Sequence, residues 1–196
     1  MDADTRPSLL KRVRDPADQQ AWREFERCYG DLVLRYALAR RLQHCDAEDL
    51  RQVVFLKLSR YLRGFEYSPQ RGRFRDYLGV VTRNAIFEFL ARPVSRPAAV
   101  EGDVWGAFPD PNSDALDEVW EREWENHHYR LALATVRRTF EPRSVEAFDR
   151  LLAGAAAADV AASLGMSLEA VTKARQRVRA RLGELIAAQV REEDQP

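Results

Sequence analysis

The residues best suited to binding chemistry are cations near the C-terminus, in the segment VTKARQRVRARL at residues 171–182. They are Lys173, Arg175, Arg177, Arg179 and Arg181. The segment contains no acidic residue, whereas a helix that is merely solvated usually mixes charges of both signs. Arginine and lysine bind phosphates, arginine also reads guanine edges, and a glutamine such as Gln176 can read adenine. A solvated basic helix is the alternative, and the composition favours DNA binding.

A helix-turn-helix pattern surrounds these cations. A short helix is predicted to end at Gly165, a residue type that readily adopts the left-handed cap conformation, and Ser167 is predicted to cap the next helix. At about 100° per residue, one narrow seam of that helix is apolar. The seam consists of Val171, Ala174, Val178, Leu182 and Leu185. We expect the seam to pack on the first helix and the cations, with Thr172, to face the major groove of DNA.

Residues that could perform catalysis or bind a metal are scarce. The histidines are His44, His127 and His128, and the last two, adjacent on a predicted helix, point about 100° apart. Cys28 and Cys45 fit no zinc or redox spacing. The sequence also contains no glycine-rich phosphate loop and no nucleophile motif. We therefore expect no enzyme activity, no cofactor and no metal site.

A second candidate binding segment is DAEDLRQVVFLKLSRYL, residues 46–62, which predicts a helix that Asp46 can cap. Its apolar arc consists of Leu50, Val53, Val54, Leu58, Tyr61 and Leu62. Leu56 falls outside this arc, among polar residues that include Asp49 and Gln52. Single exposed leucines are common, but an apolar anchor ringed by polar groups is also how protein interfaces are built. The pattern alone leaves both interpretations open.

Helical periodicity dominates the elements that must position these residues, and no convincing strand pattern occurs. The N-terminal half predicts helices at residues 17–29, 31–43, 46–62 and 73–91, with a break at Gly30 and a loop at 63–72. The last helix carries an apolar stripe of Phe74, Leu78, Val81, Ala85 and Phe89. Phe74 is therefore predicted to be a core residue. Further helices are predicted within residues 113–140 and from Ser144 to about Leu152.

The charge is unevenly distributed along a chain whose 31 basic and 31 acidic residues balance. Residues 1–95 carry 18 basic and 13 acidic side chains, residues 96–125 carry 2 and 9, and residues 126–196 carry 11 and 9. Residues 92–112 are rich in proline and predict a linker. Its Trp105 and Phe108 either dock on a neighbouring domain or belong to a loop that folds back on its own core. Without a signal peptide or a membrane-length apolar run, we expect a cytoplasmic protein with no membrane insertion.

Taken together, these motifs resemble the sigma-70-type sigma factors. The segment DAEDLRQVVFLKLSRYL resembles the part of region 2 that binds core RNA polymerase. The segment GRFRDYLGVVTRNAIFEFLAR resembles the part that melts the promoter and reads the minus-10 element. The helix-turn-helix is similar to region 4, which reads the minus-35 element. Because only a linker separates the two, the plan is similar to that of the extracytoplasmic function (ECF) group.

The resemblance implies an all-α fold of two helical domains joined by a Pro-rich acidic linker. The implied parts are a region 2-like domain at residues 1–92, the linker at 93–124, a region 4-like domain at 125–190 and a polar tail at 191–196. The implied partners are core RNA polymerase, through its clamp coiled coil and flap regions, promoter DNA, and an anti-sigma factor as a further candidate.

The resemblance also implies roles for individual residues. Those implied to bind polymerase are Asp46, Glu48, Asp49, Gln52, Phe55 and Leu56. Those implied to read and melt the minus-10 element are Phe65, Tyr67, Arg73, Arg75, Tyr77, Arg83 and Asn84, with the loop from Phe65 to Gly72 capturing a flipped-out base. Those implied to read the minus-35 element are Ser167, Val171, Thr172, Lys173, Arg175, Gln176 and Arg177. A two-domain helix-turn-helix regulator with a ligand- or partner-sensing N-terminal domain is the alternative function.

Overall fold

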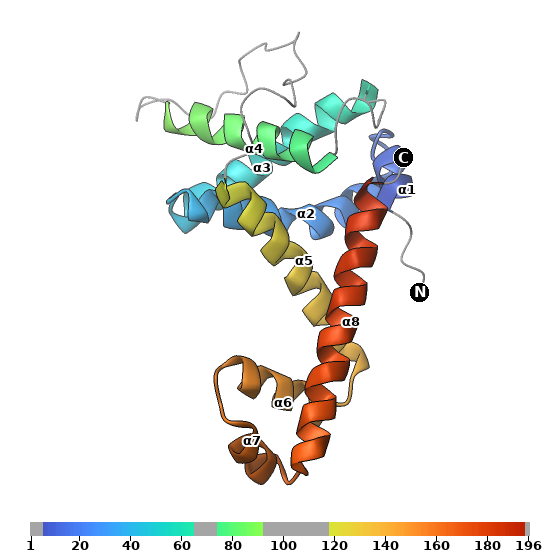
Figure 1. Ribbon diagram of the computed structural model, residues 1–196. Coiled ribbons are helices and arrows are strands. Elements are labelled where there is room, and N and C mark those ends of the chain that lie inside the picture. The colour runs from blue at the N-terminus through green and yellow to red at the C-terminus, as the bar shows by residue number, and fades with distance from the viewer. Residues whose placement is uncertain (1–5, 65–73, 92–117, 195–196) are drawn as a thin grey trace. The chain divides into compact units, whose positions relative to one another are not determined.

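The computed structural model describes residues 6–64, 74–91 and 118–194, and every regular element in these ranges is helical (Figure 1). The chain divides into two compact units, residues 1–124 with 192–196, and residues 125–191. The helices are α1 (Arg6–Arg12), α2 (Gln19–Ala39), α3 (His44–Tyr61), the 3-10 turn η1 (Leu62–Gly64), α4 (Phe74–Leu90), α5 (Glu118–Thr139), α6 (Pro142–Leu152), α7 (Ala157–Leu164) and α8 (Leu168–Asp194). The all-α prediction is confirmed.

In the first unit, α3 packs against both α2 and α4. Their aromatic side chains meet at the centre, where the Phe74 ring contacts Phe25 at 5.8 Å and Tyr29 at 5.4 Å between ring centroids. Edge-to-face contacts at this spacing stabilise a core beyond the burial of apolar area. Phe74 is fully buried, as its place on the apolar stripe predicts.

The predicted break at Gly30 is wrong, because α2 continues through it from Gln19 to Ala39. Glycine costs about 1 kcal/mol in a helix interior. The residues on both sides of Gly30 bury one continuous apolar face, including Phe25, Tyr29 and Leu32, which outweighs that cost. Tertiary packing therefore keeps α2 continuous despite the low helix propensity of Gly30.

Asp46 is not the cap of α3. The helix begins at His44, and its cap residue is Gln43, whose extended backbone (φ −67°, ψ 157°) accepts the first helical bond without a side-chain hydrogen bond. Asp46 lies in the first turn instead, where its negative charge interacts favourably with the helix dipole.

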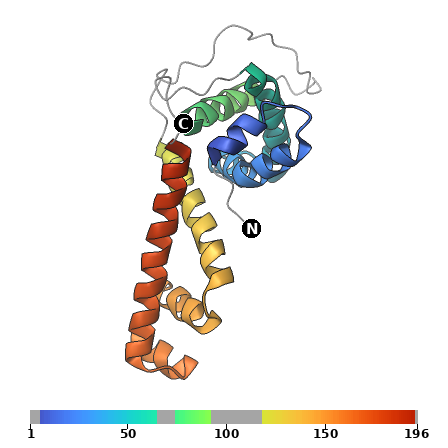
Figure 2. The ribbon, with the colours of Figure 1, turned by 90° about the vertical axis from the view of Figure 1, so that its right-hand side faces the viewer.

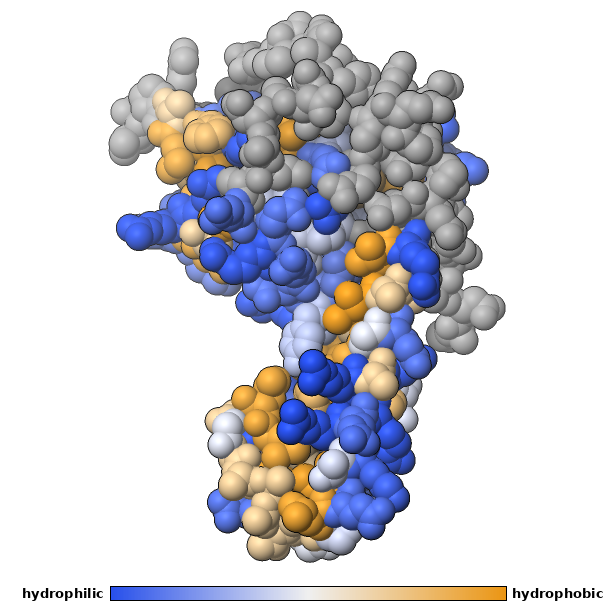
Figure 3. All heavy atoms as spheres, in the orientation of Figure 1, coloured by the Kyte–Doolittle hydropathy of each residue, from blue (hydrophilic) through white to orange (hydrophobic). Residues whose placement is uncertain are grey.

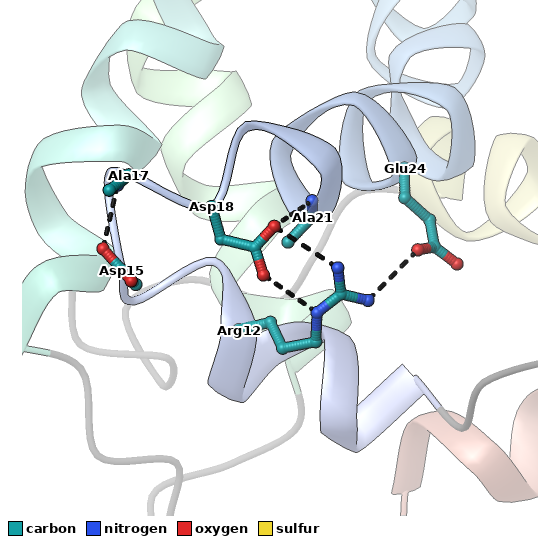
Figure 4. Close-up of polar contacts among 6 residues, drawn as sticks. All are labelled: Arg12, Asp15, Ala17, Asp18, Ala21 and Glu24. Carbon is teal, nitrogen blue, oxygen red and sulfur yellow. Dashed lines mark hydrogen bonds and ion pairs between the residues drawn. The ribbon is translucent and has the colours of Figure 1, made fainter.

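The N-terminal helix α1, which the sequence pattern did not predict, is tied to α2 by polar contacts (Figure 4). Asp18 caps α2 by accepting a hydrogen bond from the Ala21 amide at 2.8 Å. Arg12 donates to the same carboxylate, through Nε to Oδ2 at 3.0 Å, and also approaches Glu24 at 3.5 Å. The Arg12 hydrogen bond, with that of the Ala21 amide, holds the pKa of Asp18 below its ordinary value of 3.8.

The second unit contains α6, α7, the part of α5 from residue 125 onward and the part of α8 up to residue 191. Figure 2 shows α6 and α7 beside the N-terminal part of α8. The predicted turn is confirmed, since Gly165 adopts the left-handed conformation (φ 61°, ψ 37°) and the Ser167 hydroxyl accepts from the Ala170 amide at 3.1 Å. α6 begins at Pro142 rather than at Ser144, because Glu141 caps it with its carboxylate.

Two predicted boundaries differ from the helices that form. Residues 118–124 of the predicted linker are the start of α5 and belong to the first unit. Residues 191–194 of the predicted tail continue α8. Residues 93–117 of the linker, with Trp105 and Phe108, lie outside the described residues. Among the helices that are described, none combines the length and apolar composition needed to cross a lipid bilayer.

Candidate functional site

One exposed stripe of α3 combines acidic, amide and apolar side chains. Asp49, Gln52 and Leu56 follow one another at spacings of three and four residues and are all exposed, with half of the Leu56 surface (50 %) open to solvent. Residues at this spacing lie on one helix face. The opposite face holds Leu50, whose side chain is fully buried. The helix thus presents an exposed surface of mixed polar and apolar character that does not pack on the core of its own unit.

The other predicted polymerase-binding residues are less open. Glu48 pairs with Arg51 one turn later, at 2.7 Å, and Asp46 is half-buried. Phe55 packs on the core of the first unit, with its ring 5.8 Å from that of Phe25. We therefore regard Asp49, Gln52 and Leu56 as the centre of this candidate interface, and name them the α3 stripe.

The helix beside it, α4, carries the predicted minus-10 residues that the structure describes. Arg75 and Arg83 are half-buried, and Asn84 is exposed. Tyr77 is only 7 % exposed and its ring lies against Phe74, at 6.2 Å between centroids. Burial raises the pKa of the Tyr77 phenol, and the nearby Tyr61 raises it further.

Phe65, Tyr67 and Arg73, with the loop from Phe65 to Gly72, lie outside the described residues. On the described part of α4, the ring of Tyr77 faces the core, and a base could stack on it only after it moves. The cationic and amide groups of the helix are therefore the nearer candidates for nucleic-acid contact.

Arg75 is held by acidic and aromatic groups of its own unit. Its Nη2 donates to both carboxylate oxygens of Glu121, at 3.0 and 2.9 Å, and its Nε donates to Asp76 at 3.3 Å. The guanidinium also lies over the Trp124 ring, 5.9 Å from the centroid. The sequence pattern did not identify Glu121, Trp120 or Trp124 as functional. The sequence feature that could have indicated them is the pair of tryptophans one helical turn apart inside an acidic segment.

The candidate nucleic-acid face of the second unit lies on α8. Figure 3 shows hydrophilic side chains gathered along the side of this unit that α8 forms. Arg175, Gln176 and Arg177 are exposed, and within the described part of the chain no carboxylate pairs with either arginine. Lys173 is exposed as well but pairs with Glu169 at 2.7 Å.

Three of the residues assigned to this face have structural partners. Val171 is fully buried and belongs to the apolar seam, of which Ala174, Val178 and Leu182 are also buried. The Thr172 hydroxyl donates to the Leu168 carbonyl at 2.9 Å, and Ser167 is occupied as the cap. The face therefore consists of the long cationic and amide side chains rather than of the short ones.

Metal chemistry has no candidate centre in the ranges that the structure describes, where no cluster of three or more histidine, cysteine or carboxylate groups could hold an ion. His127 and His128 are both buried in the second unit, and His128 Nδ1 lies 3.0 Å from Oε1 of Gln189.

Comparison with known proteins identifies one part of the chain. Residues 26–94 match the family model described as Sigma-70 region 2. This range includes most of α2 and all of α3 and α4, and hence the α3 stripe and the candidate residues of α4. A search of curated proteins found no match. The second unit, residues 125–191, lies outside the matched range.

Proposed function

We propose that this chain is a transcription initiation factor of the ECF type, because residues 26–94 match the family model described as Sigma-70 region 2. RNA polymerase core and promoter DNA are the partners that such a domain supports. In this proposal the protein acts in the cytoplasm, binds core polymerase, selects a promoter and holds one DNA strand open. An anti-sigma factor is a further candidate partner.

The observation that carries the proposal is the α3 stripe. An exposed leucine with an acid and an amide on the same helix face has the composition of an interface centre with a polar rim. The stripe lies within the matched range, in the segment that resembles the polymerase-binding part of region 2. We propose that Leu56 inserts between side chains of the clamp coiled coil, while Asp49 and Gln52 contact polar groups around it.

The second unit supplies the contact with duplex DNA in this proposal. The left-handed Gly165 cap and the Ser167 cap set α7 and α8 in a helix-turn-helix, and α8 exposes Arg175, Gln176 and Arg177. Such a helix enters the major groove, where arginine contacts phosphates or guanine and glutamine contacts adenine. This unit would therefore locate the minus-35 element, and α4 with the loop before it would bind the separated strand near the minus-10 element.

The alternative of a helix-turn-helix regulator with a ligand-sensing N-terminal domain explains the second unit equally well. It does not account for the match of residues 26–94 to sigma-70 region 2, nor for the exposed leucine within that match. The sigma interpretation is therefore favoured.

The test is a pull-down of core RNA polymerase with the full chain and its Leu56→Asp and Asp49→Arg variants. We expect the chain to bind polymerase and both variants to lose most of that binding, because each places a charge in the centre of the interface. Leu90→Asp is the matched control, since Leu90 is a similarly exposed leucine (63 %) of the same unit on a different helix. Failure of the unchanged chain to bind, or equal binding by all variants, contradicts the proposal.

A further inference from the structure

The start of α5 is anchored on the first unit by two tryptophans. Trp120 and Trp124 are 1 % and 2 % exposed and belong to the hydrophobic core of that unit. The Trp120 ring meets Tyr36 of α2 edge-on at 5.1 Å, and the two tryptophan rings lie 6.0 Å apart. Large buried aromatic rings contribute strongly to packing, so residues 118–124 are firmly held at this place.

Glu121 lies between the two tryptophans and reaches the guanidinium of Arg75. Because the tryptophans fix the backbone on either side, Glu121 is an intramolecular partner at high effective concentration. The Arg75 side chain is 20 % exposed and contacts Glu121, Asp76 and the Trp124 ring. A guanidinium enclosed in this way cannot also bind a phosphate unless one of these partners withdraws.

The carboxylate of Glu121 indicates which ligand of Arg75 it would replace. Arginine binds carboxylates and phosphates through the same charge-assisted hydrogen bonds, so a carboxylate can stand where a phosphate of nucleic acid would lie. Arg75 is on α4, whose sequence resembles the strand-separating segment, whereas Glu121 lies beyond the matched range, in the first turn of α5. Asp76 follows Arg75 on the same helix and would remain beside it with or without α5.

We propose that residues 118–124 form an intramolecular latch. In this latch the Glu121 carboxylate binds the guanidinium of Arg75, which would otherwise bind a phosphate, and so weakens the binding of single-stranded DNA by the first unit. The inference rests on the proposed function, because it regulates the same α4 surface. DNA must displace Glu121 from Arg75 before its phosphate can bind there. The protein alone therefore binds a single strand more weakly than its cationic groups would allow.

The experiment measures binding of the full chain to a fluorescein-labelled single-stranded DNA by fluorescence anisotropy. Glu121→Gln should raise affinity roughly threefold to tenfold, because it removes a charge-assisted partner of Arg75 while leaving both tryptophans in place. Glu118→Gln is the matched control, since it removes the same charge from an exposed position one turn earlier on α5. A thermal melt of each variant checks that the fold is retained.

Arg75→Gln provides the decisive comparison. In that background, Glu121→Gln should have no more effect than Glu118→Gln, because the group that the latch covers is gone. An equal gain from Glu121→Gln and Glu118→Gln, a gain that persists without Arg75, or no DNA binding by any variant overturns the latch. The polymerase pull-down does not depend on Glu121, so a failure of the latch can be told apart from a failure of the proposed function.

Discussion

Gly30 of α2 lies against Arg51 of α3, and a Cβ atom built on it would stand 3.7 Å from Cδ and Nη1 of that arginine. This is ordinary van der Waals distance, and the nearest atoms belong to flexible side chains. The glycine is therefore a tolerated residue inside a continuous helix rather than a requirement of close packing.

Gly30→Ala is accordingly expected to stabilise the protein. Alanine loses less backbone entropy than glycine in a helix interior, so the free energy of unfolding should rise by about 0.5–1 kcal/mol. Urea denaturation monitored by circular dichroism measures the change. Gly183→Ala on α8, where no atom lies within 4 Å of the added Cβ, should give a similar gain. A loss of stability at Gly30 alone would show that Arg51 cannot shift.

Gly165→Ala should have the opposite effect. Gly165 has φ +61°, a conformation that costs an L-residue roughly 1 kcal/mol, and space around it does not relieve this strain. We expect the second unit to lose about that much stability and its duplex DNA affinity to fall. The matched comparison is Gly165→Asn, because asparagine tolerates the left-handed region better and should lose less. Equal stability of all three chains would contradict the helix-turn-helix geometry.

The Arg12–Asp18 contact makes part of the stability depend on acid pH. The folded pKa of Asp18 lies below 3.8, so its contribution is fully present above that value and is lost as pH falls through the folded pKa. Asp18→Asn should thus lower the melting temperature at neutral pH, because asparagine keeps the cap of α2 but removes the negative charge that Arg12 contacts. The difference from the unchanged chain should shrink at the lowest pH at which both remain folded. Glu26→Gln, at an exposed acid of α2, is the control and should show no such pH-dependent difference.

Arg175→Gln and Arg177→Gln test the α8 face. If each arginine neutralises one phosphate, each substitution should reduce the slope of log affinity against log salt concentration by about 0.9 on duplex DNA. Arg138→Gln, at an exposed arginine of α5 in the same unit, should leave the slope unchanged. Titrations at several salt concentrations supply the measurement. Slopes that match the control would mean that α8 is solvated rather than bound to DNA.

Periodicity alone was sufficient to predict much of the fold. The stripes of α4 and α8 are buried except for Phe89 and Leu185, which are half-buried, and the Gly165 and Ser167 caps form where their residue types indicate. These features are predictable because they depend on neighbours within a few residues. The exposed position of Leu56 follows from the same helical geometry. The prediction that the α8 seam packs on α7 is correct for Val171 but wrong for Val178 and Leu182, because these two pack with residues of α5 and α6.

Two of the missed features depend on partners distant in the sequence, and one is a local boundary. Gly30 stays helical because α2 buries one face along its whole length against other helices. The local miss is the cap of α3, because the helix starts two residues before Asp46, at His44. Arg75 and Glu121 are 46 positions apart, and no local pattern indicates that they meet. The roles assigned to the α3 stripe and to α8 remain predictions until polymerase and DNA binding are measured.

The two buried tryptophans at the start of α5 also give the protein an intrinsic optical signal. Indole emission shifts to longer wavelength when water reaches the ring, and Trp120 and Trp124 are both shielded from water while residues 118–124 are docked. Withdrawal of this segment would therefore shift the tryptophan emission of the unlabelled chain to longer wavelength. Its rate could be followed directly by mixing the protein with DNA or polymerase in a stopped-flow instrument.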